Sequence, residues 1–122
     1  DNYIRPPIAL AEAVPLGLDL AGPALETSSP ELKGERQLLD VLPLVARGQI
    51  ELPARGNLKT PTGQPMTAVV VQHPQDRVED GHEVVFQSDE PKHQYRCFLQ
   101  TWLRGTPVVP VGAAGDAGCP SP

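Results

Sequence analysis

Proline is the residue that most limits what this chain can fold into. The 122 residues include 15 prolines, scattered along the whole length. Each proline fixes its own φ angle and lacks a backbone N–H donor, so long uninterrupted helices are not expected. The irregular spacing of the prolines also excludes a collagen-like repeat. The chain should therefore consist of short elements joined by frequent turns.

Apolar residues in the second half of the chain follow a period of two, which is the period of a β-strand. Candidate strands cover residues 66–73, 82–88 and 93–103, with weaker ones before and after them. A turn is predicted at residues 60–65, where a proline is followed two positions later by a glycine. Turn signals that recur about every eight to twelve residues are typical of small all-β folds. The predicted fold class is therefore mainly β, a small antiparallel barrel or sandwich.

One helix is predicted at the start of this β-rich domain, within residues 30–42. Ser29 can cap its N-terminus, and Pro30 suits the first helical position. Leucines recur behind them at roughly helical spacing. Pro43 should end or kink the helix, because its ring is incompatible with the preceding turn.

Residues 1–27 are interpreted as an extended, proline-rich arm. The arm is rich in leucine and isoleucine, unlike a solvated linker, so it needs a surface to lie on. It can pack on its own domain or dock on a partner protein, and both interpretations stay open. The residues expected to contact a partner are Ile4, Ile8, Leu10, Leu16, Leu18 and Leu20.

The expected domain organisation has three parts. The arm at 1–27 precedes a single β-rich domain with its leading helix at 28–111. Residues 112–122 are mainly Gly, Ala and Pro, a composition that predicts a flexible C-terminal tail.

The formal net charge of the chain is −5. An acidic chain is a poor candidate for binding a phosphate backbone, so nucleic acid is not the expected partner. No apolar run approaches the roughly 18 residues that a membrane-spanning helix needs, so membrane insertion is not expected.

The two cysteines, Cys97 and Cys119, are too few for a disulfide framework and do not form a CxxC motif. In an oxidising compartment they can pair with each other. Otherwise Cys97 is interpreted as a small core residue. The sequence does not decide between the two.

The sequence contains no catalytic signature. His73, His82 and His93 lie on or beside the predicted strands and could be imagined as metal ligands, but no HExxH or paired-cysteine motif accompanies them. We interpret them as strand-end and loop residues, and we predict no enzyme activity, no metal site and no cofactor.

Residues 55–65, followed by the β-rich run at 66–71, resemble the first hairpin of OB domains that bind single-stranded DNA. The resemblance implies a groove in which bases stack on aromatic rings beside basic residues. The residues it implies for that role are Arg55, Lys59, Arg96, Phe98 and Trp102. The interpretation we favour is that Phe98 and Trp102 fill the core, because the chain has few other large side chains.

The predicted function is that of a non-enzymatic structural or assembly subunit. Its arm would bind neighbouring protein chains, or other copies of itself, in a particle or in a secretion or envelope assembly. The alternatives are an OB-like domain that binds single-stranded nucleic acid and a small metal-dependent enzyme.

Overall fold

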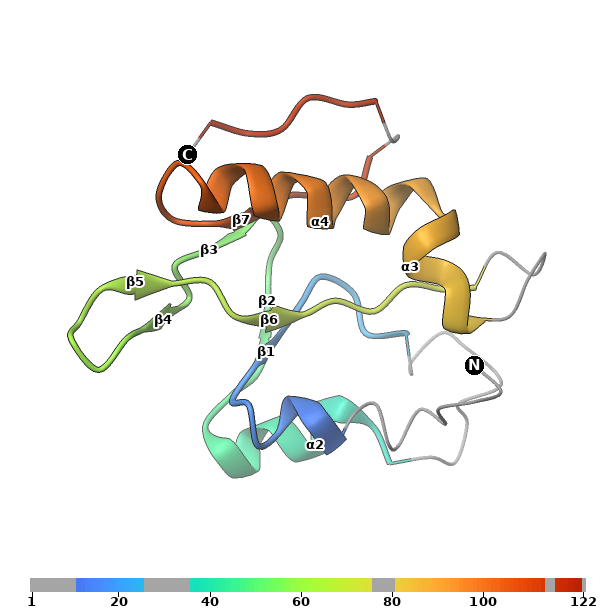
Figure 1. The fold of residues 1–122 in the computed structure, drawn as a ribbon. Helices are drawn as coiled ribbons and strands as arrows, with labels where there is room; N and C mark the ends of the chain where they lie inside the picture. Colours follow the sequence, from blue (N-terminus) through green and yellow to red (C-terminus); the bar gives the residue numbers. More distant parts are fainter. Residues whose placement is uncertain (1–10, 26–35, 76–80, 114–115, 122) are drawn as a thin grey trace. The chain divides into compact units, whose positions relative to one another are not determined.

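The chain forms two compact units, each of which is discontinuous in sequence (Figure 1). Unit 1 comprises Asp1–Ile50 and Val69–Val84, and unit 2 comprises Glu51–Ala68 and Val85–Pro122. The computed structural model describes residues 11–25, 36–75, 81–113 and 116–121.

Unit 1 is built on a three-stranded parallel sheet. Its central strand is β1 (Asp19–Ala21), which lies between β2 (Gln49–Ile50) and β6 (Val69–Val70). Leu20 stands opposite Gln49 in β2 and opposite Val70 in β6. All three residues of β1 are buried, as expected for a strand that has a neighbour on each side.

Parallel strands need a crossover connection, and the segment between β1 and β2 contains two short helices. These are α2 (Leu38–Val41) and the 3-10 helix η3 (Leu42–Val45). Pro43 lies at the start of η3, where backbone N–H groups have no acceptor within the helix. The absence of an N–H in proline therefore costs no hydrogen bond of η3. The hydrophobic core of unit 1 contains the buried residues Ala13, Leu20, Ala24, Leu38 and Leu42.

The segment before β1 is folded back rather than extended. Residues 11–13 are helical, and Gly17 ends this piece with a φ of 63°. The Gly17 N–H donates to the Val14 carbonyl and the Leu18 N–H donates to the Ala13 carbonyl, the two hydrogen bonds of a Schellman cap. The described part of the predicted arm therefore belongs to the core and sheet of unit 1.

Unit 2 combines two antiparallel strand pairs with the longest described helix. β3 (Ala54–Arg55) pairs with β7 (Val108–Val109), and β4 (Leu58–Lys59) pairs with β5 (Pro65–Met66). Helix α4 (Asp89–Trp102) packs against β7.

The predicted mainly β fold is corrected to a mixed α/β fold, and the described strands form small sheets that do not close into a barrel. The predicted strand at 93–103 is α4. The predicted strand at 82–88 is the 3-10 helix η4 (Gly81–Glu83) followed by α3 (Val84–Gln87).

The sequence analysis did not recognise the helix start that lies between the two segments it assigned to strands. Asp89, Glu90 and Pro91 are favourable in the first turn of a helix, and they form the first turn of α4. Of the predicted helix at 30–42, the described residues show only α2 and the beginning of η3, and residues 30–35 lie outside the described ranges.

None of the described helices has the length and apolar character required to cross a membrane.

Candidate functional site

Helix α4 turns a largely polar face toward the interior of unit 2. Its buried residues are Pro91, His93, Gln94, Cys97 and Thr101. His93, Cys97 and Thr101 are spaced four residues apart, so they lie one above another on the same face. Buried polar groups need partners, and the interior of unit 2 supplies them for Thr101 Oγ1 and Gln94 Nε2, whereas Gln94 Oε1 has no hydrogen-bond partner among the described residues.

Thr101 and Gln94 attach α4 to the segment that contains β7. The Thr101 Oγ1 atom donates to the Cys97 carbonyl at 2.7 Å and accepts the Val108 N–H at 2.7 Å. Gln94 Nε2 donates to the Pro110 carbonyl at 2.9 Å. Side-chain hydrogen bonds therefore hold this helix in place where aliphatic packing would usually do so.

The C-terminal segment is tied to α4 by a disulfide between Cys97 and Cys119. This is the pairing that the sequence left open. The Sγ atom of Cys97 lies 3.8 Å from both ring nitrogens of His93. Arg96 Nη2 donates to the Ala117 carbonyl and lies 3.2 Å from His93 Nδ1. These contacts fix part of the segment that the sequence analysis predicted to be flexible.

The opposite face of α4 and the C-cap residue Leu103 carry large apolar side chains that are exposed. Tyr95, Leu99, Trp102 and Leu103 are 44%, 50%, 59% and 79% exposed, and we call these four residues the apolar stripe. They fall at helical spacing on one side of α4. None of the four aromatic residues that the structure describes is buried, because Phe86 is also exposed and Phe98 is half-buried.

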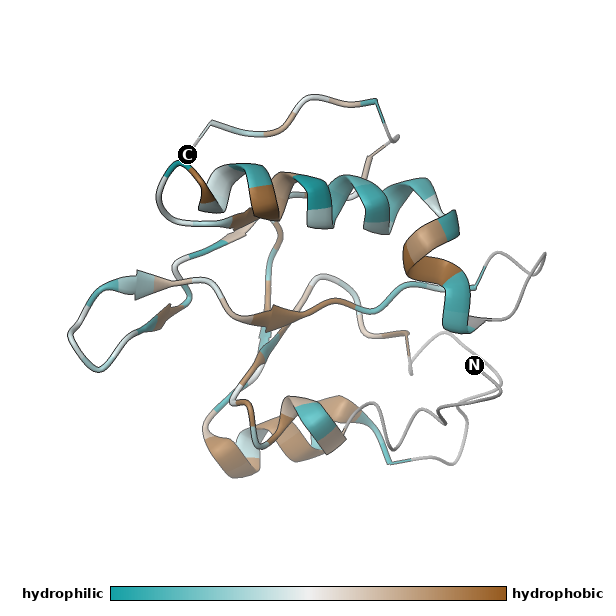
Figure 2. Ribbon diagram, in the orientation of Figure 1, coloured by the Kyte–Doolittle hydropathy of each residue, from teal (hydrophilic) through white to brown (hydrophobic). Residues whose placement is uncertain are grey.

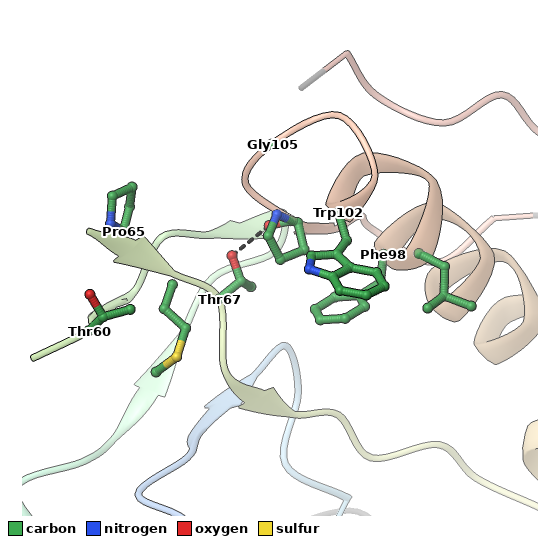
Figure 3. Close-up of a pocket in the computed structure, with 9 residues that line it drawn as sticks. Thr60, Pro65, Thr67, Phe98, Trp102 and Gly105 are labelled. Atoms are coloured by element: carbon green, nitrogen blue, oxygen red, sulfur yellow. Dashed lines mark hydrogen bonds between the residues drawn. The ribbon is translucent and has the colours of Figure 1, made fainter. Parts of the chain in front are cut away.

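A groove lies between this face of α4 and the β4–β5 hairpin (Figure 3). We call it the α4 groove, and its volume is about 450 Å³. Phe98 and Trp102, one helical turn apart, both point from α4 toward the side on which Thr67 lies. The residues that line the groove are Thr60, Pro65, Met66, Thr67, Phe98, Leu99, Trp102, Gly105 and Pro107.

Hydrogen bonds within unit 2 hold the hairpin wall of the groove. Thr67 Oγ1 accepts the Gly56 N–H at 2.9 Å and donates to the Pro107 carbonyl. The Asn57 side chain accepts the Ala68 N–H at 2.9 Å and donates to the Ala68 carbonyl at 3.0 Å. The groove is therefore a preformed feature of unit 2.

The tip of the hairpin is the turn predicted at residues 60–65. The Gly63 N–H donates to the Thr60 carbonyl at 2.9 Å, and the Thr60 N–H donates to the Gln64 carbonyl at 2.8 Å. Gly63 has a φ of 83°, a conformation that glycine adopts without strain. This prediction is confirmed.

The arm residues predicted to contact a partner have different environments. Leu20 is completely buried in the core of unit 1, Leu18 is half-buried against that core, and Leu16 is exposed. In this fold Leu20 cannot reach a partner. Ile4, Ile8 and Leu10 lie outside the described residues.

The residues implied by the OB resemblance are only partly brought together. Phe98 and Trp102 line the α4 groove, which corrects the interpretation that they fill the core. Lys59 lies on β4, next to the lining residue Thr60. Arg55 is exposed on β3, whereas Arg96 is directed to Ala117 and His93.

No group of three or more His, Cys, Asp or Glu side chains with metal-binding geometry occurs within the described ranges. His93 is buried beside the disulfide. Cys97 is bonded to Cys119, so it is no longer a nucleophile. The described residues therefore provide no assembled set of metal ligands that would support the alternative of a metal-dependent enzyme.

The sequence analysis missed the α4 groove, although a signal for it was present. Residues 95, 98, 99, 102 and 103 follow the helical pattern i, i+3, i+4, i+7 and i+8. That pattern identifies an apolar helix face, but it does not say whether the face is buried in the chain's own core.

Comparison of the chain with models of protein families, with curated proteins and with solved structures found no match.

Proposed function

We propose that this protein is a non-enzymatic assembly subunit that binds other copies of itself through the apolar stripe and the α4 groove. The proposed function is the one expected from the sequence. The contact surface that we propose lies on α4, whereas the sequence analysis placed it on the arm.

The observation that carries the proposal is the distribution of exposed apolar side chains. The described part of unit 1 exposes two large hydrophobic residues, Leu16 and Leu44. The described part of unit 2 exposes eight. Four of the eight form the apolar stripe on a single helix face. Exposed apolar surface gathered next to a groove marks an interaction site, since scattered single residues would need no explanation.

The composition of this surface fits a protein interface. Tyrosine and tryptophan are enriched at the centres of such interfaces, where their rings bury large areas at little conformational cost. The disulfide fits a small domain that functions in an oxidising compartment, where such bonds hold a limited core together.

The charges of the chain are unevenly divided between the two units. Unit 1 has eleven acidic and five basic residues, a net charge of −6, and unit 2 has four acidic and five basic residues, a net charge of +1. Each whole copy carries a net charge of −5, so two copies repel each other at long range, and the apolar contacts must outweigh this repulsion. We therefore expect self-association to strengthen as salt screens the repulsion.

The test is the native mass of the protein, measured by light scattering on a size-exclusion column over a range of concentrations. We expect the wild-type mass to rise above that of one chain and the Trp102→Ala variant to stay monomeric. Leu44→Ala is the matched control, because Leu44 is 78% exposed but belongs to unit 1 and does not line the groove. Wild-type protein that remains monomeric throughout, or association unchanged in Trp102→Ala, would refute the proposal.

A second candidate is supported by one observation: the Phe98 and Trp102 rings are accessible beside the hairpin that carries Lys59. Such rings can stack on the bases of a single-stranded nucleic acid. This candidate predicts oligonucleotide binding that weakens steeply with salt and is lost in Trp102→Ala. No binding at low salt would remove it.

A further inference from the structure

The disulfide between Cys97 and Cys119 joins two segments of unit 2 that differ in structure and in exposure (Figure 1). Cys97 lies within α4 and is completely buried. Cys119 is half-buried in residues 116–121, none of which belongs to a helix or a strand. Gly118 beside it is exposed, and a methyl group added there would meet no atom within 4 Å apart from its chain neighbours. A small molecule can therefore approach this bond from the side of Cys119.

The surroundings of Cys97 provide groups that stabilise a thiolate. Arg96 Nη2 lies 3.2 Å from His93 Nδ1. A guanidinium group donates hydrogen bonds and accepts none, so Nδ1 is the acceptor, and the proton of the neutral His93 ring is on Nε2. His93 Nε2 lies 3.8 Å from Cys97 Sγ. The sulfur of Cys97 thus has an N–H donor next to it, with the positive charge of Arg96 on the far side of the same ring.

We propose that this disulfide is a site of thiol–disulfide exchange with small-molecule thiols. The attacking thiolate forms a new S–S bond to Cys119 Sγ, while the bond between Cys119 and Cys97 breaks. The electron pair of the broken bond stays on Cys97 Sγ, which becomes a thiolate beside His93. One disulfide replaces another, so no additional oxidant or reductant takes part. The small molecule is then attached to Cys119, and residues 116–121 lose their covalent link to α4.

Two features of the structure set the direction of the attack. A thiolate attacks the sulfur that it can reach, and Cys97 is completely buried whereas Cys119 is half-buried. The other sulfur leaves more rapidly when its thiolate is stabilised, and charge-assisted hydrogen bonds and nearby cations provide this stabilisation. Cys97 has His93 and Arg96 for this purpose. Cys119 is therefore the sulfur that is attacked, and Cys97 is the one that leaves.

The site of attack can be determined on the full-length wild-type protein. The native protein is incubated with reduced glutathione, quenched with N-ethylmaleimide in denaturant and digested with trypsin. Trypsin cleaves after Arg96 and Arg104, so Cys97 and Cys119 fall in different peptides for mass spectrometry. We expect glutathione on the Cys119 peptide and N-ethylmaleimide on the Cys97 peptide. The rate should rise in proportion to the glutathione concentration, because the thiol attacks the folded protein.

His93→Phe tests the role of the imidazole ring. Phenylalanine also provides a planar ring but has no N–H group, so exchange should slow by about tenfold. Damage to the fold predicts the opposite change, because local opening would expose the disulfide and speed up exchange. His82→Phe is the matched control, since His82 is exposed and belongs to unit 1, and it should exchange at the wild-type rate. In denaturant all three proteins should react equally fast.

The possible results decide the proposal in either direction. Glutathione on the Cys97 peptide would overturn it. A rate that does not depend on the glutathione concentration would do the same, because the bond would then react only after unfolding. A folded His93→Phe variant that exchanges as fast as the wild type, or faster, would also refute it. If His93→Phe does not fold, the two wild-type measurements still decide. None of these measurements requires self-association, so the outcome is independent of the proposed function.

Discussion

In unit 1 the aliphatic side chains gather in a core, whereas in unit 2 the large apolar side chains point outward and polar groups are buried. The contrast is visible in Figure 2, where α2 and η3 are mainly hydrophobic and α4 is mainly hydrophilic. Leu20, Leu38 and Leu42 are completely buried in unit 1. The interior of unit 2 contains His93, Gln94 and Thr101 beside a disulfide, and its buried apolar residues are small, namely Ala54, Val108 and Val109.

The two units are therefore stabilised differently. Unit 1 depends on apolar burial, which contributes about 25 cal/mol for each Å² removed from water. Unit 2 buries smaller apolar side chains, and it depends in addition on hydrogen bonds, each contributing about 1 kcal/mol net, and on a covalent link that restricts the unfolded chain. Because unit 2 is held together in this way, its largest side chains need not be buried and are available for contact with another molecule.

Leu20→Ala should have the largest effect on stability. Leu20 has no exposed surface and lies on the central strand, so its truncation leaves a cavity that costs about 2–5 kcal/mol of unfolding free energy. Denaturant unfolding followed by circular dichroism measures the loss. Leu44→Ala, on the exposed side of η3, should change the value by no more than about 0.5 kcal/mol. Equal losses from both variants would show that unit 1 has no specific core.

Cys119→Ala should have the next largest effect. The disulfide spans 22 residues, and opening a loop of that size costs about 3 kcal/mol. Chemical reduction of the wild type should cause a similar loss of unfolding free energy and should leave the variant unchanged. A reduced wild type as stable as the oxidised protein would mean that hydrogen bonds alone hold unit 2.

Thr101→Val tests the buried hydrogen bonds of α4. The variant leaves the buried Val108 N–H without its acceptor, which should cost about 1–3 kcal/mol. Thr101→Ser keeps the hydroxyl group and is the matched control, with an expected loss of about 1 kcal/mol for the missing methyl group. If serine and valine cost the same, packing rather than hydrogen bonding holds the helix.

Trp102→Ala should have the smallest effect on stability. Replacing a buried aromatic residue costs about 3–5 kcal/mol, but Trp102 is 59% exposed, so we expect a change within about 0.5 kcal/mol. The measurement is the same denaturant unfolding, carried out below the concentration at which the protein associates. A large loss would place Trp102 in the core of unit 2 and remove the contrast between the units.

Local signals in the sequence predicted the turn at residues 60–65 but not the helices that follow it in the chain. The turn at residues 60–65 is present because proline and glycine determine the local backbone themselves. The pairing of Cys97 with Cys119 was one of two open possibilities, because two cysteines allow only one internal bond but do not require it.

Helix α4 was missed for a physical reason. Its buried face is polar and its apolar face is exposed, so hydrophobic periodicity did not mark the side that packs. Aromatic and β-branched residues are also common in strands, which favoured the wrong assignment. Tertiary hydrogen bonds such as those of Thr101 and Gln94 determine which face is buried, and a sequence pattern does not contain them.

The discontinuous order of the two units has a consequence for how the chain is made. Strand β6 of unit 1 follows the whole segment Glu51–Ala68 of unit 2, so the ribosome must synthesise part of one unit before the other can complete its sheet. The disulfide comes later still, because Cys119 follows every described helix and strand. Domains usually fold as continuous stretches during synthesis, starting from the N-terminus. Here neither unit can be produced by simply shortening the gene, and a nascent chain would keep β1 partly unpaired until Val70 has emerged.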